Sequence, residues 1–236
     1  TIALAQQAQQ LKQQQANVLV THSQTLRQQI ALVCSNNMSP ASIQQVKQAW
    51  QQTLNAWVPF QGETIGPVSQ LDLSWSMQFW PDKKNITGRK LSALLTDPEQ
   101  ANQGAITAAD IQQLSVAVRG LGALELLVFE TGLSAKSCPL SQAIADNVEH
   151  NAKRLQAAWQ QPQLNDSAPT PTNIALSAAD IAWVSELSHQ LSFANKKFFM
   201  PLGNGEHVKP YQAESSRSET SMAQLKTSYT SLQHLY

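Results

Sequence analysis

The sequence predicts an all-α protein, and three observations support that fold class. The chain has 236 residues but only 9 glycines and 11 prolines, fewer turn-forming residues than a β-sandwich or barrel of this length would need. Glutamine and alanine are abundant, and both are compatible with helices. Apolar residues recur at spacings of three, four and seven along most of the chain, which is the period of an amphipathic helix.

The first part of the chain predicts two long helices. Residues 2–34 carry an apolar stripe that starts with positions seven apart between Leu4 and Val18, and glutamines cover the other faces. A second helix starts at Pro40, because proline suits the first helical turn, and ends before Gly62.

Three further helices and a last helical segment follow. One begins at Thr107, with Asp110 as its capping-box partner, and runs to about Gly132. Another follows Pro139 and reaches Trp159. The sequence Ser177-Ala-Ala-Asp180 repeats the capping pattern and predicts a helix whose apolar stripe holds Ile181, Val184, Leu187 and Leu191. The last segment spans residues 219–236.

These elements predict a two-domain organisation. Residues 1–160 form an N-terminal helical bundle, and residues 161–172, which are rich in proline and small polar residues, form a linker. Residues 173–236 start a second helical bundle. Two helices bury too little apolar surface to fold alone, so they either complete the first bundle or belong to a second bundle that is incomplete in this chain.

Residues 62–86 form a structured, aromatic-rich connection rather than a flexible linker. They contain Gly62, Gly66 and two prolines together with Trp75, Phe79 and Trp80. Aromatic side chains in such a segment usually plug the end of a helical bundle. The alternative is that they line a binding site.

Glu125 is the most informative single residue. It falls on the same helical stripe as Leu121 and Val128, and a carboxylate in a core stripe is costly unless it is paired, metal-bound or protonated. Gly120 and Gly122 precede it, and glycines inside a helix indicate that something approaches the backbone closely. The structural interpretation is a buried acid that is bonded to a neighbouring helix. The functional interpretation is a ligand or metal site.

Two other polar segments are weaker candidates. Residues 80–85 place charged residues in a turn after Trp80. Residues 214–221 combine hydroxyl groups with Arg217, a set that suits either an anion site or the start of a helix. The 5 histidines show no two-histidine metal spacing, and the sequence has no nucleophile elbow, phosphate loop or dinucleotide fingerprint.

Charge and hydropathy restrict the partners. The chain has 16 basic and 16 acidic residues, and this zero net charge argues against nucleic-acid binding, which needs a basic excess. No apolar run is long enough for a transmembrane helix, and the first residues do not resemble a signal peptide, which was either never present or removed. Cys34 and Cys138 are either two buried thiols or one disulfide formed in an oxidising compartment.

Four stretches give the chain a resemblance to the imelysin-like family of bacterial envelope proteins. They are residues 49–67, with Trp50, Trp57 and Gly66-Pro67; residues 79–83 (Phe-Trp-Pro-Asp-Lys); residues 119–129, with Arg-Gly-Leu-x-Ala-Leu-Glu and a final Phe; and residues 210–221, with Pro-Tyr-x-Ala-Glu-Ser, Arg217, Ser218 and Ser221. Their shared order makes the match fairly specific.

The resemblance implies two helical-bundle domains in a periplasmic or lipid-anchored protein that is tied to iron uptake, within a family classed as metallopeptidases. It also implies a disulfide between Cys34 and Cys138, where related envelope proteins carry a cysteine pair. Two departures matter. The family motif is GxHxxE, but Gly122 occupies the histidine position, which removes a nitrogen ligand. Family members also continue about a hundred residues further, so the second bundle is expected to be truncated here.

We therefore expect a non-enzymatic protein without catalytic residues, which binds iron or an iron-related ligand at the domain junction. Iron is the one candidate cofactor, Glu125 is its candidate ligand, and a small anion or an envelope protein is the alternative partner. In this hypothesis Arg119 is the counter-charge of Glu125 or an anion clamp, Asp82 and Glu214 donate oxygens, and Trp80 forms a wall. The predicted ligand-binding residues are Trp80, Asp82, Arg119, Gly120, Glu125, Glu214, Ser215 and Arg217.

Two other functions stay open at this point. A metallopeptidase needs a metal-activated water, and Gly122 counts against it. A scaffold that binds another envelope protein would use the aromatic connection around Trp75 and Trp80 as its contact surface.

Overall fold

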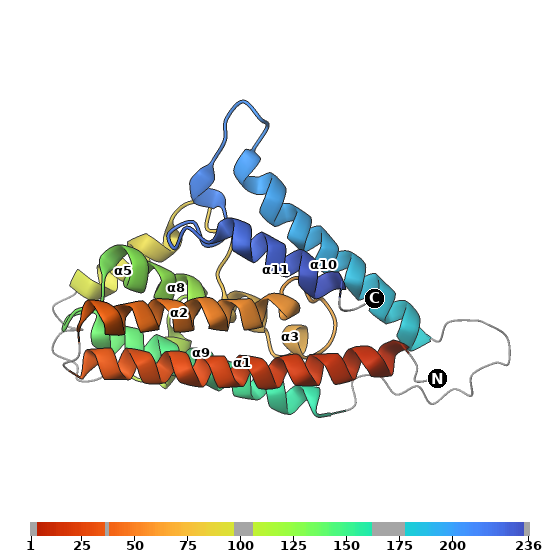
Figure 1. Ribbon diagram of the computed structural model, residues 1–236, viewed down its shortest axis with the longest axis horizontal. Coiled ribbons are helices and arrows are strands. Elements are labelled where there is room, and N and C mark those ends of the chain that lie inside the picture. Colours follow the sequence, from red (N-terminus) through yellow and green to blue (C-terminus); the bar gives the residue numbers. More distant parts are fainter. Residues whose placement is uncertain (1–3, 36–37, 97–105, 162–177, 234–236) are drawn as a thin grey trace, which may run out of the picture.

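The structure is a computed structural model that describes residues 4–35, 38–96, 106–161 and 178–233. These residues form helices and no strand, which confirms the all-α fold class. Three long helices lie side by side and make the main bundle: α1 (Leu4–Cys34), α2 (Pro40–Trp57) and α9 (Cys138–Trp159) (Figure 1). The helix α2 begins with a capping box between Ser39 and Ser42.

The core of this bundle is built from the apolar stripes that the sequence predicts. Trp50, Trp57 and Trp159 are among its largest fully buried side chains, with Leu26 and Ile30 of α1 beside them. Burial of each such side chain stabilises the fold by about 1.5–3 kcal/mol. The indole N–H of Trp50 donates a hydrogen bond to the backbone oxygen of Leu121, at 2.9 Å, so its polar group is also satisfied.

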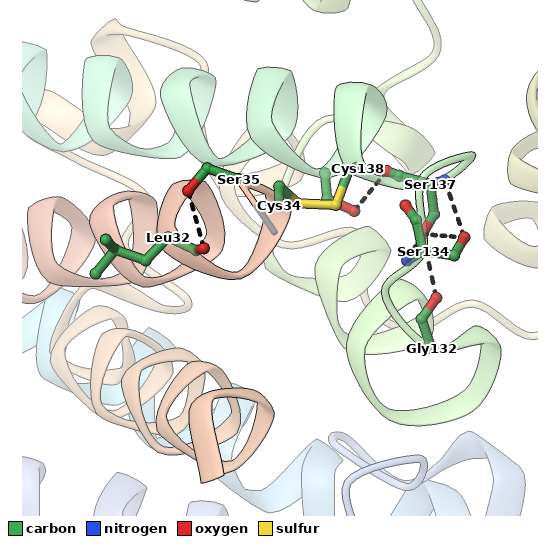
Figure 2. The surroundings of a disulfide bond; sticks show 8 residues. Leu32, Cys34, Ser35, Gly132, Ser134, Ser137 and Cys138 are labelled. Atoms are coloured by element: carbon green, nitrogen blue, oxygen red, sulfur yellow. Dashed lines mark hydrogen bonds between the residues drawn. A yellow bond between two sulfur atoms is a disulfide. The ribbon is translucent and has the colours of Figure 1, made fainter. Parts of the chain in front are cut away.

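A disulfide joins Cys34, at the end of α1, to Cys138, at the start of α9 (Figure 2). The two Cα atoms lie 5.6 Å apart, and the bond links residues 104 positions apart in the sequence. Hydrogen bonds among Ser134, Ser137 and Gly132 order the turn that leads into Cys138 (Figure 2). The predicted disulfide is therefore confirmed, and it ties together one end of the two longest bundle helices.

Short elements cover the bundle between its long helices. They are the 3-10 turn η1 (Val58–Phe60), α3 (Pro67–Gln70), α4 (Leu73–Met77), α5 (Ile86–Thr96), α7 (Ala108–Gln113), the 3-10 turn η2 (Val116–Val118), α8 (Leu121–Glu125) and the π-helical segment η3 (Leu126–Thr131). The single helix expected from Thr107 to about Gly132 is thus broken. Its capping box is present, but the backbone turns extended at Leu114 and again at Gly120.

The last described helices, α10 (Ala178–Leu202) and α11 (Ser221–Gln233), lie together along one side of the bundle (Figure 1). A loop follows α10 and leads through the 3-10 turn η4 (Pro210–Gln212) into α11. This loop projects furthest from the bundle (Figure 1). The predicted linker, residues 161–172, lies outside the described residues except for Gln161, so the domain boundaries stay a prediction.

The face of α10 that packs against the bundle is not the apolar stripe that the sequence predicts. Ile181 and Val184, which were expected on its packed face, are 55% and 49% exposed. The buried side chains on α10 are mostly polar or charged: Asp180, Glu186, Gln190 and Lys197, beside Ala179, Trp183 and Ala194. The contact between α10 and the bundle therefore depends largely on hydrogen bonds and ion pairs. No helix in the described part of the chain is long and apolar enough to cross a membrane.

Candidate functional site

The segment 210–220 connects two buried acids to their partners: Ser218 binds Glu125 of α8, and Glu214 binds Lys197 of α10. Glu125 comes from the last position of α8, and Glu214 lies within the segment itself. They are 5% and 2% exposed. The charge of Glu214 raises the pKa of Glu125, so the two carboxyl groups influence each other electrostatically.

Glu125 is held by a single residue of this segment. Its Oε1 atom accepts a hydrogen bond from the backbone N–H of Ser218, at 2.9 Å, and another from the Ser218 hydroxyl, also at 2.9 Å. Burial raises the pKa of Glu125, while the two Ser218 hydrogen bonds and the charge of Arg217 lower it in part. The net direction is upward, so this carboxyl group takes up a proton at a higher pH than an exposed glutamate would.

Glu214 is held by a larger network. Its Oε1 atom accepts hydrogen bonds from the side-chain amides of Gln61, at 2.7 Å, and Gln78, at 2.9 Å. Its Oε2 atom lies 2.7 Å from Lys197 Nζ, and that ammonium also donates to Gln61 and to Ser228. Burial lowers the pKa of Lys197, and the nearby Glu214 carboxylate opposes that shift. The network joins the 61–66 loop, α10 and α11.

Arg217 and Ser215 complete the segment. Arg217 donates to Glu130, at 2.9 Å, and to Asn85, also at 2.9 Å, so it ties the segment to η3 and to the start of α5. Ser215 has a positive φ of 57°, and its hydroxyl is buried without a hydrogen-bond partner among the described residues. A buried hydroxyl without a partner is uncommon in a folded protein, and this one directly follows Glu214 in the sequence.

Trp80 and Gly120 also border this region, and each has a structural partner. The indole N–H of Trp80 donates to the backbone oxygen of Gln212, at 3.1 Å, so the ring is fixed against the segment. A Cβ atom on Gly120 would lie 2.3 Å from the Met77 backbone oxygen, which explains why glycine stands there. Gly122 has no such neighbour, because its nearest contact would be the Phe79 oxygen at 3.7 Å.

Asp82 and Arg119 are placed differently from the hypothesis. Both carboxylate oxygens of Asp82 cap α5: they accept hydrogen bonds from the backbone N–H groups of Ile86, at 2.7 Å, and Thr87, at 2.8 Å. The guanidinium of Arg119 donates to the Leu114 backbone oxygen, at 2.7 Å from Nε, and so holds the break in the expected long helix. The expected pairing of Arg119 with Glu125 is therefore wrong, and the cation that acts on Glu125 is Arg217.

Sequence reasoning missed Gln61, Gln78 and Lys197 at this site. In a glutamine-rich chain, two particular glutamines do not stand out as binding residues. Lys197 lies on the face of α10 that the sequence did not predict to be buried. Ser218 was part of the motif that carries the resemblance, but its contact with Glu125 could not be read from the sequence.

Two of the cavities that lie against the network are large enough for a small molecule. The larger, of about 590 Å³, is lined mainly by apolar side chains of α10, α11 and the loop between them, with Lys197, Glu214 and Arg217 among its lining. The smaller, of about 350 Å³, is lined on the other side by tryptophans and by Gln61 and Gln78. Among the described residues, no three histidine, cysteine, aspartate or glutamate side chains gather into a group that could hold a metal ion.

The described residues define the class of the protein as an α-helical bundle that buries two acids, Glu125 in α8 and Glu214 in the segment 210–220. The sequence profile of the imelysin family, peptidase M75, matches residues 8–236, and the chain belongs to that family.

One solved structure illustrates the shared fold. It is an imelysin-like protein from Psychrobacter arcticum 273-4, which superposes with a TM-score of 0.76 and 17% sequence identity. The match covers 98% of this chain and 75% of that protein. At this identity the likeness concerns the fold alone. No curated protein matches this chain.

Proposed function

We propose that this chain is a non-catalytic binding protein of the bacterial envelope, periplasmic or lipid-anchored, which serves iron uptake and binds iron or an iron-related ligand beside Glu125. The observation that carries the proposal is the Glu125 carboxyl group, which is 5% exposed and is held by Ser218 alone among the hydrogen-bond donors of the segment 210–220. Buried acids with a shifted pKa are concentrated at functional sites.

The donor set around Glu125 suits a hard cation. Glu125, Glu214 and the orphan hydroxyl of Ser215 all offer oxygen, and iron, like other hard cations, accepts carboxylate and hydroxyl oxygens. The carboxylates are bonded to protein donors, so binding would exchange Ser218 or Gln78 for the ligand. The larger cavity reaches Glu214 and Arg217, and it offers room for an organic group around the metal.

Binding is favoured over hydrolysis by the residue at position 122. A histidine three residues before Glu125 would share its face of α8, and glycine offers no donor there. Metal-dependent hydrolysis usually uses three protein ligands and an activated water. The residues of this chain therefore supply the acid of the family motif without its nitrogen ligand.

An anaerobic titration tests the proposal. Chelator-stripped protein is titrated with Fe(II), and separately with Fe(III) citrate, copper and zinc, beside Glu125→Gln and the matched control Glu206→Gln, which changes an exposed loop acid. We expect saturable iron binding that is lost in Glu125→Gln and kept in the control. Equal binding by all three proteins, or no binding of any iron species, would contradict the proposal.

The metallopeptidase alternative rests on the family to which the chain belongs. It predicts zinc-dependent cleavage of an unstructured peptide that is abolished by a chelator and by Glu125→Ala. Because a Cβ on Gly122 meets nothing closer than 3.7 Å, Gly122→His can restore the motif in a folded protein. Cleavage by the wild type would replace our proposal; cleavage by Gly122→His alone would support it, since the lost histidine would then account for the lost activity.

A further inference from the structure

The smaller cavity lies between the 61–64 loop, residues 74–80 and α10, and its lining includes neither Glu125 nor any residue of the segment 210–220. Its volume of about 350 Å³ is within the range of small-molecule sites. Gly62 brings the loop against α10 so closely that a Cβ there would lie 2.5 Å from Phe193 Cβ. The loop and α10 are therefore in close contact along this wall of the cavity.

Its walls are aromatic. Trp57, Trp75, Trp80 and Phe193 all line it, and Trp80 and Phe193 meet edge to face with centroids 5.6 Å apart. The indole N–H of Trp80 is already donated to Gln212, so this side chain presents ring surface. Trp75 is 45% exposed, although most tryptophans of the bundle are buried. Such walls favour a flat ring as the occupant.

Lys196 gives this cavity an exposed positive charge. Lys196 is exposed, lines the cavity, lies 5.9 Å from the Trp80 ring centre, and forms no salt bridge with any described residue. Glu63 also lines the cavity, but its side chain is fully buried. Burial raises the pKa of Glu63 to about 8, so it is largely neutral at pH 7.

Two other acids lie near the cavity, and both are bound by protein groups. Glu214 pairs with Lys197 and accepts from the amides of Gln61 and Gln78. Glu186 accepts hydrogen bonds from the backbone N–H groups of Thr64 and Ile65 and from the Thr64 hydroxyl, at 2.9–3.1 Å. Hydroxyl groups of Ser74 and Ser192 add neutral polar atoms to the lining. The electrostatic balance of the cavity therefore favours a negative ligand over a positive one.

We propose that this cavity binds a planar organic anion, an aromatic carboxylate whose ring stacks between Trp75 and Trp80 and whose carboxylate pairs with Lys196. The proposal does not depend on iron binding at Glu125. Gln61 and Gln78 line this cavity and also bind Glu214, so they separate it from the candidate iron site. The two sites use different charged residues: Lys196 in this cavity and Glu125 in the other.

The test uses three probes of matched size or charge in calorimetric titrations of the whole chain. They are 2-naphthoate, 2-naphthylmethylammonium, which reverses the charge, and cyclohexanecarboxylate, which removes the aromatic ring. We expect binding of 2-naphthoate with at least about tenfold preference over the other two. Preference for the ammonium probe, or no binding of 2-naphthoate, would overturn the proposal.

Four variants locate the probe. Lys196→Gln is compared with Lys226→Gln, which removes an exposed charge from α11, and Trp75→Leu is compared with Phe199→Leu, another exposed aromatic. We expect the first of each pair to weaken 2-naphthoate binding by about fivefold or more, and the controls to bind as the wild type. Equal affinity within either pair would refute the assigned site. Glu125→Gln should bind 2-naphthoate normally, which separates this test from that of the iron site.

Discussion

Glu125 and Ser218 are 93 residues apart in the sequence, yet both hydrogen-bond donors of Ser218 meet one carboxylate oxygen of Glu125, each at 2.9 Å. This contact fixes the segment 210–220 onto α8 and partly offsets the rise in the pKa of Glu125 that burial causes. It explains why a motif near the end of the chain and a motif in its middle belong to one site.

Ser218→Ala removes the hydroxyl but keeps the backbone N–H. Because a buried carboxylate then loses one of its two donors at Oε1, we expect the free energy of unfolding to fall by about 1–3 kcal/mol. The pKa of Glu125 should rise further, since a hydrogen bond to its charged form is lost. Urea denaturation measures the first effect. Ser188→Ala, at an exposed position of α10, is the control, and an equal loss in both variants would argue against the contact.

Gly120 and Gly122 form a matched pair of substitutions two residues apart. Gly120→Ala would push a Cβ to 2.3 Å from Met77 O and 2.5 Å from Ser76 O, so we expect a loss of about 3 kcal/mol or more. Gly122→Ala has room and removes a glycine from α8, so it should be neutral or stabilising by up to about 1 kcal/mol. Thermal unfolding of both variants checks the contrast, and similar melting temperatures would contradict it.

The buried carboxyl group of Glu63 should make the stability of the folded protein depend on pH. Both of its carboxylate oxygens are buried without a hydrogen-bond partner among the described residues, and Lys12 Nζ is 4.0 Å from the nearer one. The folded protein keeps a proton on Glu63 up to about pH 8, whereas an exposed glutamate loses it near pH 4.5. The folded state thus binds more protons between these values, and this contribution to stability is lost as the pH rises through that window.

Glu63→Gln isolates this effect, because glutamine does not titrate. Burial also lowers the pKa of Lys12, and this shift makes the protein more stable as the pH rises, opposite to the effect of Glu63. The quantity to compare is therefore the difference in the free energy of unfolding between the wild type and the variant. We expect the variant to gain stability relative to the wild type as the pH increases from about 5 to 8. Urea titrations at several pH values measure this gap, and a gap that does not change with pH would refute the prediction.

The disulfide between Cys34 and Cys138 closes a loop of 104 residues. By the loop-entropy account it contributes about 4–5 kcal/mol to the free energy of unfolding. Reduction with dithiothreitol should therefore lower the denaturation midpoint strongly, and the double variant Cys34→Ser, Cys138→Ser should show the same midpoint with and without reductant. An unchanged midpoint after complete reduction would show that the bond does not stabilise the fold.

The apolar periodicity of the sequence predicted the long, regular helices of the fold. The stripes of α1 and α9 are regular because these two long helices pack extensively against each other. Glu125 was identified as buried because it lies on an apolar stripe of its own segment. The break at Leu114 to Gly120 could not be read in this way. It depends on Arg119 binding a carbonyl five residues earlier and on the close approach of Met77 to Gly120.

The orientation of α10 shows a second limit of periodicity. Its apolar stripe was expected to face the bundle, but Glu186 and Lys197 face it instead because they satisfy the backbone of the 61–65 loop and the Glu214 carboxylate. Partners such as Gln61 and Glu214, which lie 153 residues apart, leave no local signal in a single sequence. The sequence thus indicated the acids Glu125 and Glu214, but it gave no indication of the polar side chains that bind Glu214.

The most direct test of the central claim is to locate the metal. Crystals of the chelator-stripped protein are soaked anaerobically with Fe(II), and anomalous difference maps are measured above and below the iron absorption edge. Our account predicts one strong peak within bonding distance of a Glu125 carboxylate oxygen, absent in Glu125→Gln crystals. A peak elsewhere in the molecule, or no peak in the wild type at full saturation of the soak, would contradict it.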